Sequence, residues 1–303
     1  MNDSSTKRSL AYLFASLTIL FWGTSASAFK IALRYLEPIP FLFFASWTAF
    51  LLLGIILLFQ GRLSDVFKFS ARQYLFSLGL GFLNPFAYYV ILFQAYDRLP
   101  AQIAQPLNFI WPITLVLLSI PILGQRLSLR SIFALVVSFM GVFFISSQGK
   151  ILNFEFADPL GVSLALGSSV IWALFWLFNI RDHRKEEEKL FLNFFTASLL
   201  ISIMMLFYDK PQQYEWEGVA ASVYVGVFEM GITFVLWLKA LKLAGRTAKL
   251  SNLIYLTPFT ALVFIHIILG EEIFYTTLIG LVLIVGGIII QQRDQKKLLK
   301  KKA

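Results

Sequence analysis

The sequence predicts an all-α integral membrane protein of ten transmembrane helices, built as two inverted five-helix repeats. Three observations support this fold class: the composition, a stretch that occurs twice, and the uneven distribution of lysine and arginine. Hydrophobic residues make up 58% of the 303 residues and charged residues only 14%. A soluble domain carries roughly 25% charged residues. The chain therefore lacks the polar surface to face water on all sides.

The repeated stretch covers residues 107–127 and 253–273. An offset of 146 aligns LNFIWPITLVLLSIPILGQRL with LIYLTPFTALVFIHIILGEEI, and it places Pro112 on Pro258. A period near half the chain length indicates a duplicated unit. We therefore expect a first repeat at 1–148 and a second at 149–303, the second ending in a basic tail.

Ten apolar segments are long enough to approach the ~20 residues that a bilayer-spanning helix needs. Short, turn-like connectors separate them, and none is long enough to hold a soluble domain. The expected spans are 10–33, 40–59, 74–95, 100–121, 130–147, 160–180, 190–207, 218–241, 247–269 and 275–292.

Lysine and arginine set the expected orientation. With the amino terminus inside, 20 of the 26 basic residues fall on the inner side and four on the outer side. Cytoplasmic loops carry such an excess, so both termini are expected in the cytoplasm. Five spans per repeat is an odd number, so the halves are inverted relative to each other. Inverted repeats are typical of alternating-access transporters, whose substrate site lies near the midplane.

Several functions are disfavoured by what the sequence lacks. It has no cysteine and two histidines, too few for a disulfide framework or a common metal centre. It has no GxxxxGK[ST] loop, so we expect no ATP hydrolysis and no cofactor. The formal charge of +9 is explained by the loops rather than by nucleic acid. The expected partners are a small-molecule substrate and the lipid bilayer. One chain suffices for a complete cavity, so a monomer is enough for the mechanism. A dimer is the alternative.

Glu229 is the most informative polar residue, because it lies about halfway along the expected eighth span. A charged carboxylate at that depth faces a cavity or a partner, or is protonated. We interpret it as a site of proton coupling or of ammonium binding; a protonated carboxyl that joins two helices is the alternative. The repeat pairs it with Asn84 of the third span. Thr233 and Trp237 follow on the Glu229 face and Tyr88 on the Asn84 face.

Aromatic residues lie deep in the spans. Trp22, Trp111, Trp172 and Trp176 stand away from the interfacial belt where membrane tryptophans usually lie. We expect them to line a cavity that stacks on an aromatic or cationic substrate. Ordinary helix packing is the alternative for each of them.

The paired prolines are candidate gating bends. Pro112 and Pro258 are expected to kink their helices at equivalent positions, with helix shape alone as the alternative. Asn108 and Tyr255 stand near these bends and are candidate substrate contacts. Vestibule positions are expected for Gln102, Gln105, Lys249 and Asn252.

Other polar residues are expected to have ordinary roles. Lys30 should extend to the interface, and His266 should be an interfacial hydrogen-bonding residue. The run 181–189 should be a solvated connector, and the tail 296–302 should touch anionic headgroups.

Several short motifs resemble a known family. They are Phe21-Trp22-Gly23, the segment Asn108 to Pro112, Ile171-Trp172, the segment Tyr255 to Pro258, and Gly270-Glu271-Glu272. With ten spans, they resemble the EamA family of the drug/metabolite transporter superfamily, and in particular its bacterial exporters of aromatic amino acids and related metabolites. The resemblance implies a central cavity lined by spans 1, 3, 4, 6, 8 and 9, with bundles that rock around it. The family's Gly-Glu after the fourth span is Gly124-Gln125 here, so a gating salt bridge is not carried over.

The sequence thus predicts a secondary transporter that exports small organic metabolites, amino acids or similar zwitterions, by alternating access. Uptake or exchange of nucleotide-like metabolites or cofactors is the alternative. A membrane enzyme is disfavoured because His266 is the single histidine within a span and no midplane aspartate exists. A channel or scaffold is the remaining class. The expected location is the bacterial inner membrane, as a multi-pass protein.

Overall fold

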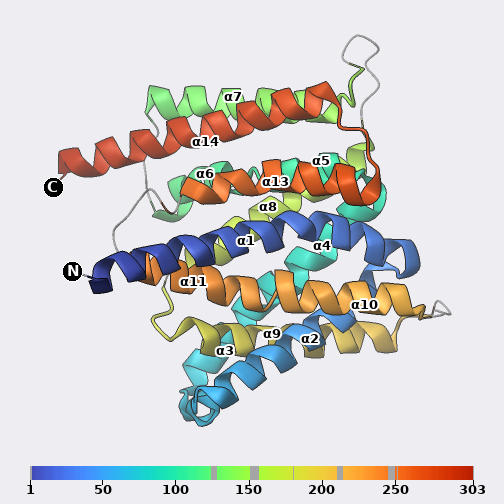
Figure 1. Ribbon diagram of the computed structural model, residues 1–303, viewed down its shortest axis with the longest axis vertical. Coiled ribbons are helices and arrows are strands. Elements are labelled where there is room, and N and C mark those ends of the chain that lie inside the picture. Colours follow the sequence, from blue (N-terminus) through green and yellow to red (C-terminus); the bar gives the residue numbers. More distant parts are fainter. Residues whose placement is uncertain are drawn as a thin grey trace.

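The structure is a computed structural model that describes residues 2–123, 128–150, 157–179, 181–209, 214–244, 250 and 252–302. Within these ranges every regular element is helical. The helices lie side by side in one bundle, and the two ends of the chain lie at the same end of it (Figure 1). We call this the terminal end, and the other the far end.

The long helices are those expected for membrane spans, and several are interrupted by 3-10 or π segments. In chain order the elements are α1 (Asn2–Tyr35), α2 (Pro38–Phe59), η1 (Leu63–Lys68), α3 (Ala71–Gly81), η2 (Phe82–Ala87), α4 (Tyr88–Arg98), α5 (Ala101–Asn108), α6 (Trp111–Leu123), α7 (Leu129–Ser146), α8 (Pro159–Asn179), α9 (Glu186–Leu206), α10 (Trp216–Tyr224), η4 (Val225–Glu229), α11 (Ile232–Ala244), η5 (Asn252–Leu256), α13 (Thr257–Phe264), η6 (Ile265–Leu269) and α14 (Tyr275–Lys302).

Nine stretches of the described chain are long and apolar enough to cross a bilayer. Each corresponds to one expected span, with ends that differ by a few residues. The expected span 247–269 is described from 252 onward, and its apolar helical part, Leu253–Leu269, is shorter than the other nine. An all-helical protein with this many apolar helices is a multi-pass membrane protein.

Helices of the first half pack mainly against helices of the second. α7 pairs with α14 along one margin of the bundle, α2 packs on α9, and α1 lies against α10, α11 and α13 (Figure 1). The α7–α14 contact is close because glycine faces glycine. A Cβ atom added to Gly141 would lie 2.5 Å from the Gly280 carbonyl oxygen, and one added to Gly280 would lie 2.5 Å from that of Gly141. Small residues of this kind let membrane helices approach closely.

The third and eighth spans are both interrupted near their middle. η2 separates α3 from α4, and Asn84 within it has a non-helical backbone (φ −145°, ψ 121°) before a cis bond to Pro85. η4 separates α10 from α11 and ends at Glu229. The two polar residues that the repeat pairs thus stand at interruptions of their helices, and π segments of this kind recur at functional sites.

The spans that hold the paired prolines are interrupted, as expected. Pro112 is the second residue of α6 and Pro258 the second residue of α13, so each lies in the first turn after the interruption. The interruption itself lies in the turn before each proline, at Phe109-Ile110 and in η5. The physical reason is that proline lacks an N–H and has a fixed φ, which suit the first helical turn.

The run 181–189 is only in part the solvated connector that was expected: Arg181, His183 and Lys185 are exposed, and other residues of the run are buried. Arg184 pairs with Asp182 at 2.5 Å, with both side chains 6% exposed, and it also donates to the Ser77 hydroxyl at 2.7 Å. Lys189 is buried and donates to Glu186 and to the Asp182 carbonyl. The segment folds back onto α3 because these cations need buried partners.

Lys30 extends to the end of the third span. Its Nζ donates to the carbonyl oxygens of Tyr96 at 2.7 Å and Leu99 at 3.2 Å, at the end of α4. These two oxygens lie where a helix has unpaired carbonyls, so the ammonium caps the end of α4. Gly124-Gln125 and Lys249 lie outside the described residues, and the side chains of Asn252 and of the tail are likewise not described.

Candidate functional site

The bundle holds a cavity of about 420 Å³ that is lined by residues of α1, α4, α5, α6, α8, η4, α11, η5, α13 and α14. Its volume lies in the range of small-molecule sites. Ten of the candidate residues line it: Trp22, Tyr88, Asn108, Trp111, Pro112, Trp172, Trp176, Glu229, Trp237 and Tyr255. These residues come from both halves of the chain.

Glu229 is the acidic residue of the described lining, and two hydroxyl groups hold its carboxyl. Ser25 of α1 donates to Oε2 at 2.5 Å and Tyr89 of α4 donates to Oε1 at 3.2 Å. The Trp22 indole N–H donates to the Glu229 backbone carbonyl at 3.4 Å, an oxygen that the end of η4 leaves available. Two contacts therefore hold the carboxyl, and a third holds the backbone of the same residue, at the wall of the cavity. It is placed to receive a proton or an ammonium group.

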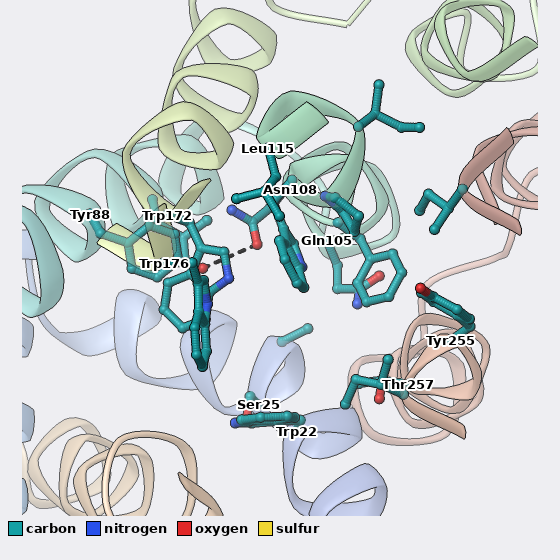
Figure 2. Close-up of a pocket in the computed structure, with 18 of the residues that line it drawn as sticks. Trp22, Ser25, Tyr88, Gln105, Asn108, Leu115, Trp172, Trp176, Tyr255 and Thr257 are labelled. Atoms are coloured by element: carbon teal, nitrogen blue, oxygen red, sulfur yellow. Dashed lines mark hydrogen bonds between the residues drawn. The ribbon is translucent and has the colours of Figure 1, made fainter. Parts of the chain in front are cut away.

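Aromatic rings form a continuous wall beside the carboxyl. The Tyr88 and Trp172 ring centroids are 4.7 Å apart, and Trp172 lies 6.1 Å from Trp176. Trp22 lies 6.3 Å from Trp237. Figure 2 shows Tyr88, Trp172 and Trp176 on one side of the cavity, with Tyr255 and Thr257 on the opposite side. These rings offer faces on which a planar or cationic group can stack.

Asn108 links helices beside the aromatic wall (Figure 2). The Tyr88 hydroxyl donates to its Oδ1 at 3.1 Å, and its Nδ2 donates to the Ser168 hydroxyl at 2.8 Å. Asn108 thus joins α4, α5 and α8 while also lining the cavity. Both the oxygen and the nitrogen of its side-chain amide have partners, so Asn108 acts chiefly to hold the aromatic wall in position.

Three candidates do not line the cavity. Asn84 is buried, with a side-chain oxygen that has no partner. Thr233 is fully buried and donates to the Phe228 carbonyl in the interrupted eighth span. Pro258 is buried in the first turn of α13. Helical spacing from Glu229 placed both Thr233 and Trp237 on the cavity side; Trp237 lines the cavity, whereas Thr233 does not.

Sequence reasoning missed several lining residues. Ser25, Tyr96, Thr257, Gln291 and Gln292 all line the cavity. Ser25 could have been identified from the sequence, because it is a polar residue about one helical turn after Trp22. No sequence pattern identified the two glutamines, because only the fold shows that α14 passes beside η5. There, Gln292 donates to the Tyr255 hydroxyl.

Hydrogen bonds close the far end of the bundle, beyond the cavity. The Glu271 carboxylate accepts from the backbone N–H groups of Ala101 at 2.9 Å and Gln102 at 3.1 Å, at the start of α5. The Gln102 side chain donates to the Glu272 carbonyl at 2.8 Å and accepts from the Phe274 N–H at 2.9 Å. We call this set of contacts the far-end latch. Gln102 thus belongs to the latch and Gln105 to the cavity lining, while the exposed His266 ring lies 3.0 Å from the Glu271 carbonyl oxygen.

The cavity continues towards the terminal end. Its lining includes Trp176, three residues before the end of α8, and Gln291 and Gln292, just before the end of the last span. The described lining thus reaches towards the terminal end, whereas Gln102 and Glu271 of the latch lie outside it at the far end. Among the described lining residues there is no lysine, arginine or histidine. In the same part of the chain no three histidine, aspartate or glutamate side chains come together as metal ligands.

A multi-pass helical bundle with an aromatic cavity that contains one acidic residue is typical of membrane transport proteins. The comparisons agree with this class. A family model for the EamA-like transporter family matches residues 9–147 and 159–291. The chain belongs to this family.

Relatives named as transporters cover nearly the whole chain. A Bacillus subtilis (strain 168) protein, "Uncharacterized transporter YvbV", is 26% identical over 96% of this chain and 93% of its own length. An "Uncharacterized transporter" of Archaeoglobus fulgidus is 22% identical over 94% of this chain and 99% of its own. One crystal structure matches with a TM-score of 0.67 at 21% identity, over 96% of this chain and 99% of the other, which shows a shared fold.

Proposed function

We propose that this protein is a secondary transporter that exports small organic amines, amino acids or similar zwitterions among them, by alternating access across a bacterial cytoplasmic membrane. The observation that carries the proposal is the position of Glu229. Its carboxyl is held by Ser25 and Tyr89 at the wall of an aromatic cavity. An ammonium group at this carboxyl would gain a charge-assisted contact, and neighbouring rings would stabilise the cation further.

Glu229 has two roles in this proposal. When ionised it binds the substrate ammonium, and when protonated it releases it, so one site couples proton and substrate movement. Both states have a partner in the described contacts, since Ser25 donates to an ionised carboxyl and also accepts from a protonated one. This dual role is the simplest route from a single buried acid to gradient-driven transport.

Alternating access is supported by the unequal ends of the cavity. The far-end latch holds α5 against the segment between η6 and α14, while the lining continues to the terminal end. A transporter needs a second state in which the latch is open and the terminal end is closed. The two halves, 1–148 and 149–303, are proposed to be inverted repeats that exchange these states.

The lining chemistry favours amines over nucleotide-like substrates. A phosphate group needs lysine, arginine or a cluster of N–H donors, and the described lining residues include no basic side chain. The acidic Glu229 would repel a phosphate. We therefore favour export of amines over uptake or exchange of nucleotide-like metabolites.

The test is transport by the full chain in proteoliposomes. We expect saturable accumulation of aromatic amines and amino acids that depends on a pH gradient and is lost in Glu229→Gln. The matched control is Glu217→Gln, an exposed glutamate in α10, which should transport normally. Gradient-driven accumulation that survives Glu229→Gln would refute the coupling role. Accumulation of nucleotides but not of amines would refute the substrate class.

A further inference from the structure

A second pocket, of about 390 Å³, lies between η5, α13 and α14. Its described lining consists of Tyr255, Leu256, Phe259, Val285, Ile289, Gln292 and Arg293. Leu256 is 51% and Ile289 37% exposed, so this pocket opens on the outside of the bundle. Its basic residue, Arg293, stands where the last span ends. We call it the outer pocket.

The outer pocket exists because α13 and α14 pack on different partners. α14 lies along α7, whereas α13 lies along α1 (Figure 1). A hydrogen bond bridges the space between them, donated by the Gln292 side chain to the Tyr255 hydroxyl. Both residues also line the central cavity. The Tyr255–Gln292 pair is therefore a wall that the central cavity and the outer pocket share.

The lining changes from apolar to basic along α14. Val285, Ile289 and Arg293 follow one another at intervals of four residues, so they stand on one face of the helix. In the sequence, Lys296 and Lys297 continue this spacing beyond Arg293. Basic pockets between transmembrane helices bind anionic lipid headgroups. An apolar pocket that ends at an exposed arginine matches an acyl chain and the phosphate above it.

The same features disfavour other small ligands. A substrate amine would meet the Arg293 guanidinium at the mouth of the pocket, and like charges repel. A soluble anion would contact Arg293 but would leave the apolar walls uncovered, although burial of apolar surface is what such walls contribute to binding. A ligand that is anionic at one end and apolar along its length uses both parts.

We propose that the outer pocket binds an anionic phospholipid, whose acyl chain lies against the Tyr255–Gln292 pair while its phosphate contacts Arg293. The lipid belongs to the leaflet at the terminal end of the bundle, which the basic residues of the sequence predict to be cytoplasmic. A bound chain supports one wall of the central cavity from outside. This inference does not depend on the proposed function, because it concerns the lipid and not the transported substrate.

Native mass spectrometry of the purified full chain tests the site. The probes are phosphatidylglycerol and phosphatidylcholine with identical acyl chains, so that only the headgroup differs. Arg293→Gln removes the charge, and Ile289→Trp fills the pocket but keeps the charge. The matched controls are Arg72→Gln, at an exposed position in the first turn of α3, and Val282→Trp, at an exposed position of α14 outside the pocket.

We expect the native chain to bind one phosphatidylglycerol about fivefold more tightly than phosphatidylcholine, the contribution of one basic residue at a membrane surface. Arg293→Gln should reduce this preference towards one. Ile289→Trp should weaken binding of both lipids about fourfold or more, the effect of at least one methylene group that is no longer buried. Both controls should keep the native affinities. Excess glycerol phosphate should not displace the lipid, because it has no acyl chain.

Four results would overturn the proposal, and all of them leave the proposed function intact. A headgroup preference that is absent from the native chain, or unchanged in Arg293→Gln, excludes the phosphate contact. Unchanged lipid affinity in Ile289→Trp excludes the pocket; Leu256→Trp is the independent variant if Ile289→Trp does not fold. Displacement by glycerol phosphate assigns the site to a soluble anion. A dimer that is lost in Ile289→Trp assigns the pocket to a second copy of the chain.

Discussion

Replacing Glu271 with glutamine tests whether the far-end latch controls access to the cavity. The carboxylate accepts two backbone hydrogen bonds, 2.9 Å from Ala101 and 3.1 Å from Gln102, at the first turn of α5. A carboxylate at a helix N-terminus is further stabilised by the helix dipole. Glutamine keeps one acceptor oxygen but loses the second bond and the charge.

The size of the effect follows from these contacts. Hydrogen bonds to charged groups contribute about 1.5–3 kcal/mol and neutral ones about 1 kcal/mol. Glu271 is half-buried, so we take a loss of about 1–3 kcal/mol from the latched state. That corresponds to a roughly 5- to 150-fold shift of the population towards a state open at the far end.

The assay uses the absence of cysteine from the chain. Ala26 lines the cavity and is small, so Ala26→Cys introduces a single reporter with little change in volume. In proteoliposomes, a membrane-impermeant maleimide is added from the far side and the labelling rate is measured. We expect Glu271→Gln to raise this rate at least fivefold.

Glu272→Gln is the matched control. It changes the neighbouring glutamate, which takes part in the latch through its backbone carbonyl, and it should leave the labelling rate unchanged. The gating interpretation is refuted if Glu271→Gln lowers the thermal unfolding temperature without changing the labelling rate. Glu271 would then only cap α5.

Three further predictions concern the aromatic wall, the packing of α7 on α14, and the ion pair beside α3. Trp172→Ala should weaken binding of aromatic amines about 10-fold through loss of stacking, whereas exposed Trp216→Ala should not, as calorimetry will show. Gly141→Leu should destabilise the protein by about 1–3 kcal/mol through overpacking, measured by thermal unfolding. A Cβ at Gly286 meets no atom within 4 Å. Gly286→Leu should therefore leave the unfolding temperature nearly unchanged. Burial alone would raise the pKa of Asp182, but its hydrogen bonds from Arg184 outweigh burial and hold that pKa below its ordinary value. Its stabilising contribution is therefore present above about pH 4 and lost as the pH falls through the lower folded-state value. Asp182→Asn should thus be less stable than the native chain at pH 6, and the difference should shrink as the pH falls below 4, measured by thermal unfolding.

Much of the fold follows from patterns that can be read locally along the chain. Apolar length fixes where helices cross, because an unpaired backbone group in lipid is too costly to leave outside a helix. The single carboxylate at membrane depth and the tryptophans around it were likewise visible, since both depart from what a lipid-facing helix contains. Nine expected spans and ten lining residues were identified in this way.

The errors share one physical cause, which is that a side chain's direction depends on backbone interruptions and on neighbours distant in the sequence. Regular helical spacing put Thr233 beside Glu229 on the cavity side, but its hydroxyl donates to the Phe228 carbonyl and it does not line the cavity. The partners of Lys30, the carbonyls of Tyr96 and Leu99, could not be identified locally either, because they lie 66 and 69 residues further along the chain.

By itself, the sequence predicted many apolar spans, a stretch that occurs twice, and an acid about halfway along the eighth span. These predictions depend on composition and period, which need no knowledge of packing. Only the tertiary structure decided what the acid contacts, that the far-end latch joins α5 to the segment before α14, and that Asn108 of α5 contacts Ser168 of α8. Those facts arise where helices of one half pack against helices of the other, so no local pattern contains them.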